Sequence, residues 1–208
     1  MLAGWGSFAG AFSIVVAALV GKNALSDYRH QKLLDREIIA AEEALISAYK
    51  AFDAVEHMRG RLIPGHESVN AEETLLEAGV NLNEMDEKTK RANVTRGVIY
   101  RRAEFFKPDF DAIFEAIPLA KVYFGQETVE RLKQFPKARN RMLESADMLP
   151  LASTNNTSAD REFSLRIRRD VFGAAENEAD EIRDMTTTAM AELEAELLPR
   201  LRAEKEKA

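Results

Sequence analysis

The chain has 208 residues, of which 46% are hydrophobic and 31% are charged, and its formal net charge is −6. This balance excludes a wholly disordered chain, and the acidic charge argues against broad affinity for nucleic acid. Because the chain contains no cysteine, disulfides, thiolate metal sites and a cysteine nucleophile are excluded as well. The ten glycines and six prolines, with no alternating β-branched runs, favour an all-α fold.

The first feature along the chain is the stretch 2–21, where twenty consecutive positions carry no charged side chain. As a helix it would be about 30 Å long, which is the thickness of a bilayer core. A cleaved signal peptide and a buried core helix are the two alternatives. The stretch lacks a preceding Lys or Arg, a clear small-x-small cleavage site and a polar stripe. It therefore predicts a transmembrane anchor at residues 1–21, followed by a helical domain at residues 22–208.

The charges that flank this stretch predict its orientation. Lys22, Arg29, Lys32 and Arg36 follow it, whereas no basic side chain precedes it. Because Lys and Arg are retained on the cytoplasmic side of a membrane, we expect the N-terminus outside and the body in the cytoplasm. This arrangement is general among bacterial inner-membrane proteins, and the sequence shows no resemblance to a particular family.

Small residues in the same stretch predict self-association. Gly6 and Gly10 form a GxxxG pattern, and Ala9, Ser13 and Ala17 form a second row at a spacing of four. Small side chains at this spacing let two transmembrane backbones approach closely. We therefore expect a homo-oligomer that forms through the transmembrane helix. The alternative is that a segment rich in Ala and Gly produces these spacings by chance.

The remainder of the chain predicts an elongated antiparallel bundle of about four main helices with coiled-coil-like character. Its first helix contains no Gly or Pro between residues 22 and 59 and is expected to end near Arg61. Apolar residues recur along it at alternating steps of four and three, at Leu34, Ile38, Ala41, Leu45, Ala48, Phe52 and Val55. Further apolar residues are expected to widen this buried face, namely Leu33, Ile39, Ile46 and Tyr49.

A short helix and a second long helix are expected next. Residues 70–73 resemble a capping box that opens the short helix, and Gly79 is expected to end it. The second long helix is expected at about residues 83–106. Residues 105–125 are rich in aromatic side chains and are expected to form two short helices with a corner between them.

Two more long helices are expected in the last third of the chain. The third covers residues 126–148, with a kink or a split at Pro136 and an end at Pro150. The fourth covers about residues 158–204, and Gly173 is expected to weaken it without ending it.

The charged residues are distributed in blocks. Residues 67–87 hold seven acidic and no basic side chains, residues 88–107 hold seven basic and one acidic, and residues 170–196 hold nine acidic and one basic. We expect these blocks to pair across helices inside the bundle. The alternative is that they present oppositely charged faces to a partner.

No group of residues predicts a particular reaction. Asp27-x-x-His30 and Asp53-x-x-x-His57 each place an acid and an imidazole on one helical face. A di-iron carboxylate bundle, however, requires two Glu-x-x-His pairs, and the chain has none. It also has no phosphate-binding glycine loop and no nucleophile elbow. We therefore expect no catalytic, cofactor-binding or metal site, and no bound cofactor.

Basic residues concentrate where helices of alternating direction would return to the membrane. We expect them to form a membrane-proximal surface that contacts anionic lipid. The residues are Lys22, Arg29, Lys32, Arg101, Arg102, Lys107, Arg200, Arg202, Lys205 and Lys207. The alternative is that they complement the dipoles of helix C-termini.

These features predict a non-enzymatic, single-pass membrane-anchored helical scaffold or interaction protein. Its expected partners are the lipid bilayer, a second copy of the chain and an unknown protein, and nucleic acid is not expected. The alternative is a membrane-tethered enzyme or nucleic-acid effector. It would use the Arg-rich segments at 101–102 and 166–169.

Overall fold

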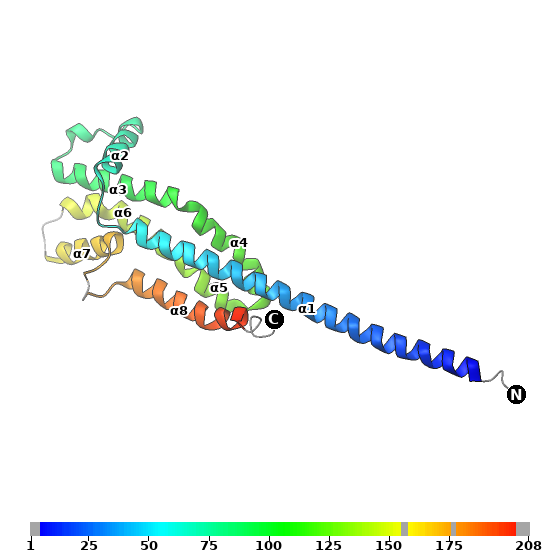
Figure 1. Cartoon of the computed structure of the whole chain (residues 1–208). Coiled ribbons are helices and arrows are strands. Elements are labelled where there is room, and N and C mark those ends of the chain that lie inside the picture. Colours follow the sequence, from blue (N-terminus) through cyan, green and yellow to red (C-terminus); the bar gives the residue numbers. More distant parts are fainter. Residues whose placement is uncertain (1–4, 155–157, 176–177, 203–208) are drawn as a thin grey trace. The chain divides into compact units, whose positions relative to one another are not determined.

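The computed structural model describes residues 5–154, 158–175 and 178–202, with side chains described from residue 28 onward except at 154, 158 and 159. All secondary structure in these ranges is helical, which confirms the predicted all-α fold (Figure 1). The elements are α1 (Trp5–Met58), α2 (Gly65–Glu77), the 3-10 helix η1 (Leu82–Glu84), α3 (Glu87–Phe105), α4 (Lys107–Tyr123), α5 (Gln126–Leu132), α6 (Gln134–Thr154), α7 (Ser158–Phe172) and α8 (Glu181–Arg202).

The chain divides into two compact units, Met1–Ala40 and Ala41–Ala208. In its described residues the first unit consists of the N-terminal part of α1 alone. The second contains the last part of α1 and every other element. The predicted boundary between residues 21 and 22 stays a prediction.

The membrane anchor is not supported. Within the residues that the structure describes, no helix is both long enough and apolar enough to cross a membrane. The predictions of a transmembrane helix at residues 1–21, of a single-pass inner-membrane protein and of an outside N-terminus with a cytoplasmic body are therefore wrong. Residues 2–4 lie outside the described residues. Nearly half of the stretch 2–21 is Ala and Gly, whose small side chains add little apolar area. The stretch is therefore less hydrophobic than its lack of charged residues suggests.

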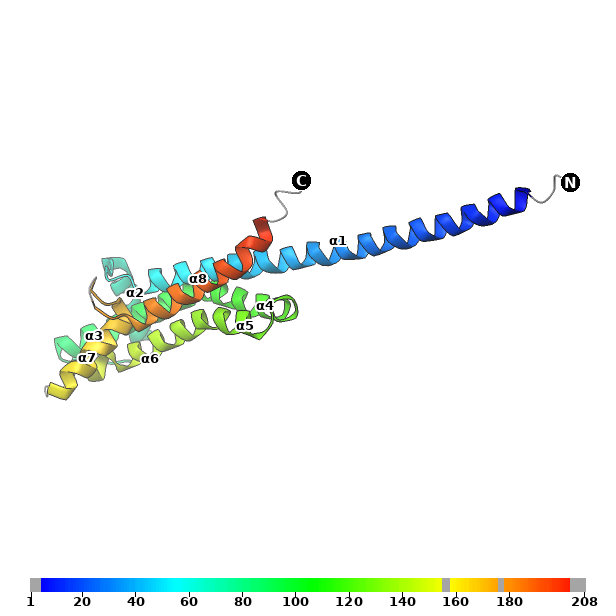
Figure 2. The same ribbon diagram turned by 90° about the horizontal axis from the view of Figure 1, so that it is seen from below.

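The larger core of the unit Ala41–Ala208 forms where α1, α4, α5, α6 and α8 meet. Its largest fully buried side chains include Met58, Ile113, Leu132, Phe135 and Leu193. A smaller core joins α3, α6 and α7 around Ile99, Ile167 and Val171, and α2 packs on α3. Figures 1 and 2 show α8 beside the part of α1 that belongs to this unit.

From Ala41 onward the predicted heptad stripe becomes an intramolecular core and not a coiled-coil seam, whereas its first residue, Leu34, is exposed. Ala41, Leu45, Ala48 and Val55 are buried in the larger core, and Phe52 is half-buried against it. The buried face also includes three alanines that the stripe did not contain, Ala44, Ala51 and Ala54. The expected widening by Leu33, Ile39, Ile46 and Tyr49 is wrong, because all four are exposed. Alanine on the inner face lets neighbouring helices approach α1 closely.

Several helix boundaries differ from those expected. α2 begins at Gly65 after Pro64, so residues 70–73 lie inside a helix and form no capping box. Gly79 has a φ of +80°, and it ends this segment as predicted. α3 begins later than expected, at Glu87, because the Asp86 side chain accepts hydrogen bonds from the Lys88 and Thr89 amides.

The effect on the helices was predicted correctly at Pro136 but not at Pro118, Pro150 or Gly173. The chain is split between α5 and α6 at Lys133, close to Pro136 as predicted. In contrast, Pro118 and Pro150 lie inside α4 and α6, so residues 107–123 form one helix and α6 continues to Thr154. Gly173 has a φ of +77° and ends α7, so the predicted fourth helix is two helices.

Candidate functional site

A cleft opens between the end of α1, α2 and α3, all within the unit Ala41–Ala208. We call it the Phe105 cleft. Its volume is about 690 Å³, which is within the range of pockets that bind small molecules or anchor side chains. It is lined by Glu56, His57, Gly60, Leu62, His66, Glu67, Asn70, Val98, Arg101, Arg102, Phe105 and Phe106.

Arg102 fixes the shape of this cleft. Its Nε and Nη2 donate to Glu67 Oε2 at 3.0 and 2.7 Å, which joins α3 to α2. The same guanidinium donates to the carbonyl oxygens of Met58, Gly60 and Leu62 at 2.8–3.3 Å. Because a guanidinium has five donors in a rigid plane, one side chain holds the turn after α1 against two other helices.

The rim of the Phe105 cleft is apolar and faces solvent. Leu62 is 81% exposed and Phe105 is 77% exposed. Phe105 lies edge-to-face against Phe106, with ring centroids 4.9 Å apart, and the centroid of the His57 ring lies 5.7 Å from that of Phe106. Edge-to-face contact with Phe106 favours this orientation of the exposed Phe105 ring.

Positive charge lies on one wall of the cleft. Arg101 Nη1 donates to Asn70 O at 3.2 Å and to Thr74 Oγ1 at 3.1 Å, both of which are neutral oxygens. Glu67 is already paired with Arg102. The His57 ring nitrogen Nδ1 lies 2.8 Å from Asp53 O, and His66 is exposed at the rim. Among the described lining residues, Glu56 is the one carboxylate not paired with Arg102.

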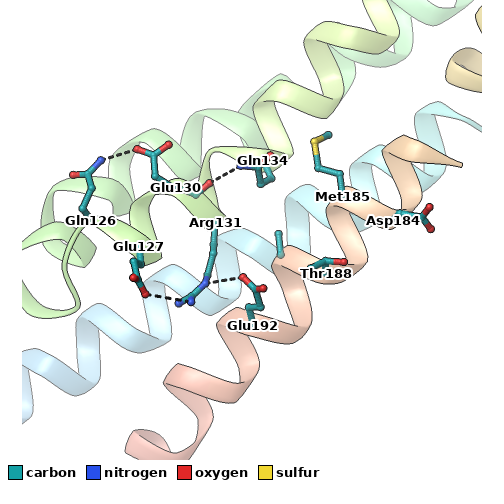
Figure 3. Close-up of a pocket in the computed structure, with 10 residues that line it drawn as sticks. Gln126, Glu127, Glu130, Arg131, Gln134, Asp184, Met185, Thr188 and Glu192 are labelled. Carbon is teal, nitrogen blue, oxygen red and sulfur yellow. Dashed lines mark hydrogen bonds and ion pairs between the residues drawn. The ribbon is translucent and has the colours of Figure 1, made fainter.

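A second groove lies between α5 and α8, and ion pairs within the protein line it. Arg131 lies at the centre of this groove (Figure 3). Its guanidinium contacts Glu127 at 3.6 Å, Glu192 at 2.9 Å and Glu196 at 2.6 Å. Burial alone lowers the pKa of Arg131, but these carboxylates outweigh it and raise the pKa. These ion pairs stabilise the packing of α5 against α8.

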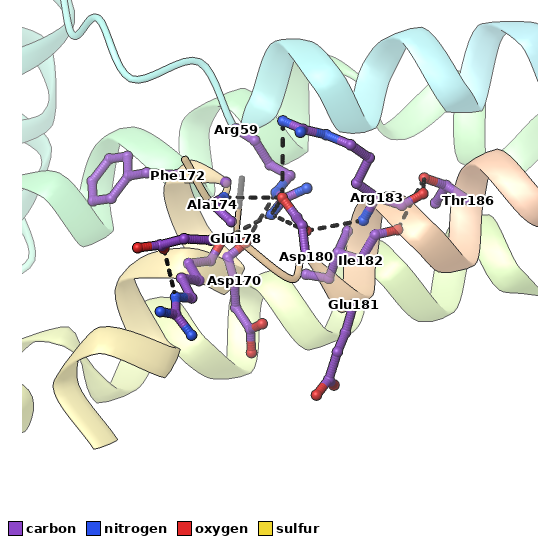
Figure 4. Close-up of polar contacts among 12 residues, drawn as sticks. Arg59, Asp170, Phe172, Ala174, Glu178, Asp180, Glu181, Ile182, Arg183 and Thr186 are labelled. Carbon is purple, nitrogen blue, oxygen red and sulfur yellow. Dashed lines mark hydrogen bonds and ion pairs between the residues drawn. The ribbon is translucent and has the colours of Figure 1, made fainter. Parts of the chain in front are cut away.

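A buried polar network joins the end of α1 to the connection between α7 and α8 (Figure 4). Arg59 Nη2 donates to Asp180 Oδ1 and Oδ2 at 2.7 and 2.9 Å, and to Arg169 O at 2.7 Å. Asp180 also accepts hydrogen bonds from the Ala174 and Arg183 amides. Next to it, Asp170 accepts from Arg141 and from Ser145 Oγ. The polar groups satisfy one another, so we interpret this network as structural.

The charge blocks pair across helices at several points, as expected from the sequence. Lys90 and Arg102 on α3 pair with Glu72 and Glu67 on α2, and Arg131 pairs with the acidic block on α8. In the part of the chain whose side chains are described, no cluster of three or more His, Asp or Glu is arranged to hold a metal ion.

The predicted membrane-proximal residues are not gathered at one place in the unit Ala41–Ala208. Arg101 and Arg102 lie beside residues 58–62, whereas Arg200 lies 5.1 Å from the centre of the Phe124 ring. Because α8 begins beside Arg59, its end lies about 30 Å farther along the bundle. Lys107 pairs with Asp111, and Arg202 ends α8. Lys205 and Lys207 lie outside the described residues, and Lys22, Arg29 and Lys32 belong to the other unit.

The residues predicted to self-associate lie in α1, in a part whose side chains the structure does not describe. They are Gly6, Ala9, Gly10, Ser13 and Ala17, and their role stays a prediction.

Sequence reasoning missed Leu62 and Phe105 as surface features. The adjacent pair Phe105-Phe106 was a usable signal, because neighbouring helical residues point about 100° apart and rarely share one buried face.

Comparison with known proteins gives no match to any family model, curated protein or solved structure.

Proposed function

We propose that this chain is a non-enzymatic helical scaffold that binds a protein partner in the Phe105 cleft. The observation that carries this proposal is the exposure of Leu62 and Phe105 at the rim of a concave site. Exposed apolar groups around a pocket are typical of protein interfaces, where a few buried anchors supply most of the binding free energy.

The chemistry of the cleft selects the kind of partner. The apolar rim and the partly buried Phe106 suit a large apolar side chain such as Leu or Phe. Arg101, with no carboxylate among its hydrogen-bond partners, suits an acidic residue beside that anchor. The expected partner segment is thus a short amphipathic helix with an apolar anchor and an acidic flank, a recurring mode of recognition in helical grooves.

A display library of helical peptides, selected on the full-length protein, tests the proposal. The selected peptides should combine Leu or Phe with Asp or Glu, and Phe105→Ser or Arg101→Gln should weaken their binding at least tenfold. Val122→Ser is the matched control, because Val122 is 75% exposed on α4 and does not line the cleft. Peptides whose affinity is unchanged by Phe105→Ser, or falls equally with Val122→Ser, would overturn the proposal.

A second candidate activity, self-association, rests on the unit Met1–Ala40. The described part of this unit is a single helix, which has no core of its own. Four of its large apolar side chains are exposed, namely Tyr28, Leu33, Leu34 and Ile39. An isolated helix gains most of its stability from packing an apolar face. Residues 22–40 carry four basic and three acidic side chains, so two copies would not repel each other.

We propose that a second copy covers this helix, and the molar mass in solution tests it. Light scattering of the full-length protein should give at least twice the mass of one chain. Leu33→Glu with Leu34→Glu should reduce it to one chain, whereas Leu76→Glu, at an exposed apolar position on α2, should not. A monomeric wild-type protein would contradict the proposal.

A further inference from the structure

A third groove lies between α3, α6 and α7, and its charge is opposite to that of the whole protein. We call it the Arg168 groove. Its volume is about 690 Å³. It is lined by Glu87, Lys88, Arg91, Ala92, Thr95, Leu149, Ala152, Ser153, Arg161, Ser164, Arg168 and Phe172. Four of these side chains are cationic and one is anionic, within a chain whose net charge is −6.

Two helices line the groove with residues at the same spacing, and each contributes two cations. On α3, Lys88, Arg91 and Thr95 are separated by three and four residues, so they lie along one face. On α7, Arg161, Ser164 and Arg168 repeat that spacing. Both faces line the same groove, so it collects positive charge from two helices.

Most of this positive charge is not neutralised by the protein. Glu87 Oε1 accepts from Arg91 Nε at 2.8 Å, which accounts for one of the four cations. No described carboxylate forms an ion pair with Lys88, Arg161 or Arg168, so three positive charges remain in excess. Like charges placed close together are unfavourable, and a bound anion removes the repulsion.

The other lining residues indicate which chemical groups the bound anion contains. Ser153 and Ser164 donate their hydroxyl protons to the carbonyls of Pro150 and Ala152, so the cations are the main donors toward a ligand. Ala92, Leu149, Ala152 and Phe172 supply an apolar lining. Arginine guanidinium groups match the geometry of phosphate oxygens, and an apolar surface suits a flat organic group.

We propose that the Arg168 groove binds a small organic phosphate, in which Arg161, Arg168 and Lys88 hold the phosphate group and the apolar lining contacts the organic part. This site is separate from the Phe105 cleft, and it does not depend on the proposed scaffold function.

Isothermal titration of the full-length protein with ADP and with inorganic pyrophosphate, at low ionic strength, tests this proposal. ADP should bind saturably below about 1 mM and more tightly than pyrophosphate, because only ADP reaches the apolar lining. Both affinities should fall as salt rises. Arg161→Gln and Arg168→Gln should each weaken ADP binding about tenfold.

Arg166→Gln is the matched control. Arg166 lies on the same helix but does not line the groove, and its guanidinium lies over the Phe163 ring. Melting curves separate binding from folding: without ligand, Arg168→Gln should melt no lower than the wild type, because it relieves repulsion. At one ADP concentration, ADP should raise the melting temperature of the wild type and of Arg166→Gln more than that of Arg168→Gln. Absence of saturable binding by ADP and pyrophosphate, or an equal loss with Arg166→Gln, would overturn the proposal.

Discussion

Arg59 and Asp180 form an ion pair across 121 positions of the sequence, with Arg59 Nη2 2.7 Å from Asp180 Oδ1. Their side chains are 4% and 3% exposed. Taking two charges out of water is costly, and the cost is recovered only where every remaining hydrogen-bonding group is satisfied. Here two backbone carbonyls of α7, together with the amides of Ala174 and Arg183, complete the set.

Removing one member of this pair should be strongly destabilising. Arg59→Leu leaves the Asp180 carboxylate buried without its cation, so we expect a loss of about 3–5 kcal/mol in the free energy of unfolding. Urea denaturation followed by circular dichroism measures it. Lys107→Gln is the control, because its ion pair with Asp111 is exposed and should contribute little. Equal midpoints for Arg59→Leu and the wild type would mean that the pair is dispensable.

The same pair predicts how stability depends on pH. Burial works to raise the pKa of Asp180, but the hydrogen bonds from Arg59, Ala174 and Arg183 outweigh it and lower the pKa. A carboxyl whose folded pKa is lowered stabilises the fold above its unfolded pKa, about 3.9, and loses that contribution as pH falls through the folded pKa. Urea midpoints between pH 2 and 6 should therefore fall less steeply below pH 4 in Asp180→Asn than in the wild type. Parallel curves would contradict the assignment.

The core can be tested at two phenylalanines that differ in burial. Phe135 is 0% exposed in the larger core, so Phe135→Ala should cost about 3–5 kcal/mol. Phe114 is exposed on α4, and Phe114→Ala should cost less than about 1 kcal/mol. Phe52→Ala should lie between them, because Phe52 is only half-buried. The melting temperatures of the three variants should follow this order, and a different order would contradict the packing.

Two glycines should respond in opposite directions to replacement by alanine. Gly173 has a φ of +77°, which an L side chain rarely adopts, and an added Cβ would lie 3.5 Å from Asp180 Oδ2. Gly173→Ala should therefore destabilise by about 1 kcal/mol or more. Gly65 begins α2 and has open space around it, so Gly65→Ala should be neutral or stabilise by up to about 1 kcal/mol. Chemical denaturation of both variants checks the contrast.

Much of the helical content was predictable because it is encoded locally. Along the predicted fourth helix an apolar stripe is expected at Ile167, Val171, Ala175, Ala179, Ile182, Met185, Ala189, Leu193, Leu197 and Leu201. Six of these ten residues are buried, whereas Ala175 and Ala179 are exposed. The split near Pro136 and the stop at Gly79 follow from the backbone limits of proline and glycine.

The misses have causes that lie far away in the sequence. Gly173 ends a helix because Arg59 and Arg61, more than a hundred residues earlier, hold the carbonyls around it. No local pattern contains that information. The Phe105 cleft depends in the same way on Arg102, which joins the turn after α1 to α2 and α3. Periodicity identifies which helical faces are apolar, but it does not identify which of them stay uncovered.

The position of Asp180 also has a consequence for synthesis of the chain. Asp180 caps the start of α8 and is the partner of Arg59. Arg59 leaves the ribosome 121 residues before Asp180, and its guanidinium must stay hydrated during that interval. The apolar residues of α1 that pack on α8 stay uncovered for at least as long. The nascent chain therefore exposes part of its final core until α8 has been synthesised, and exposed apolar surface of this kind makes a partly folded chain prone to aggregate.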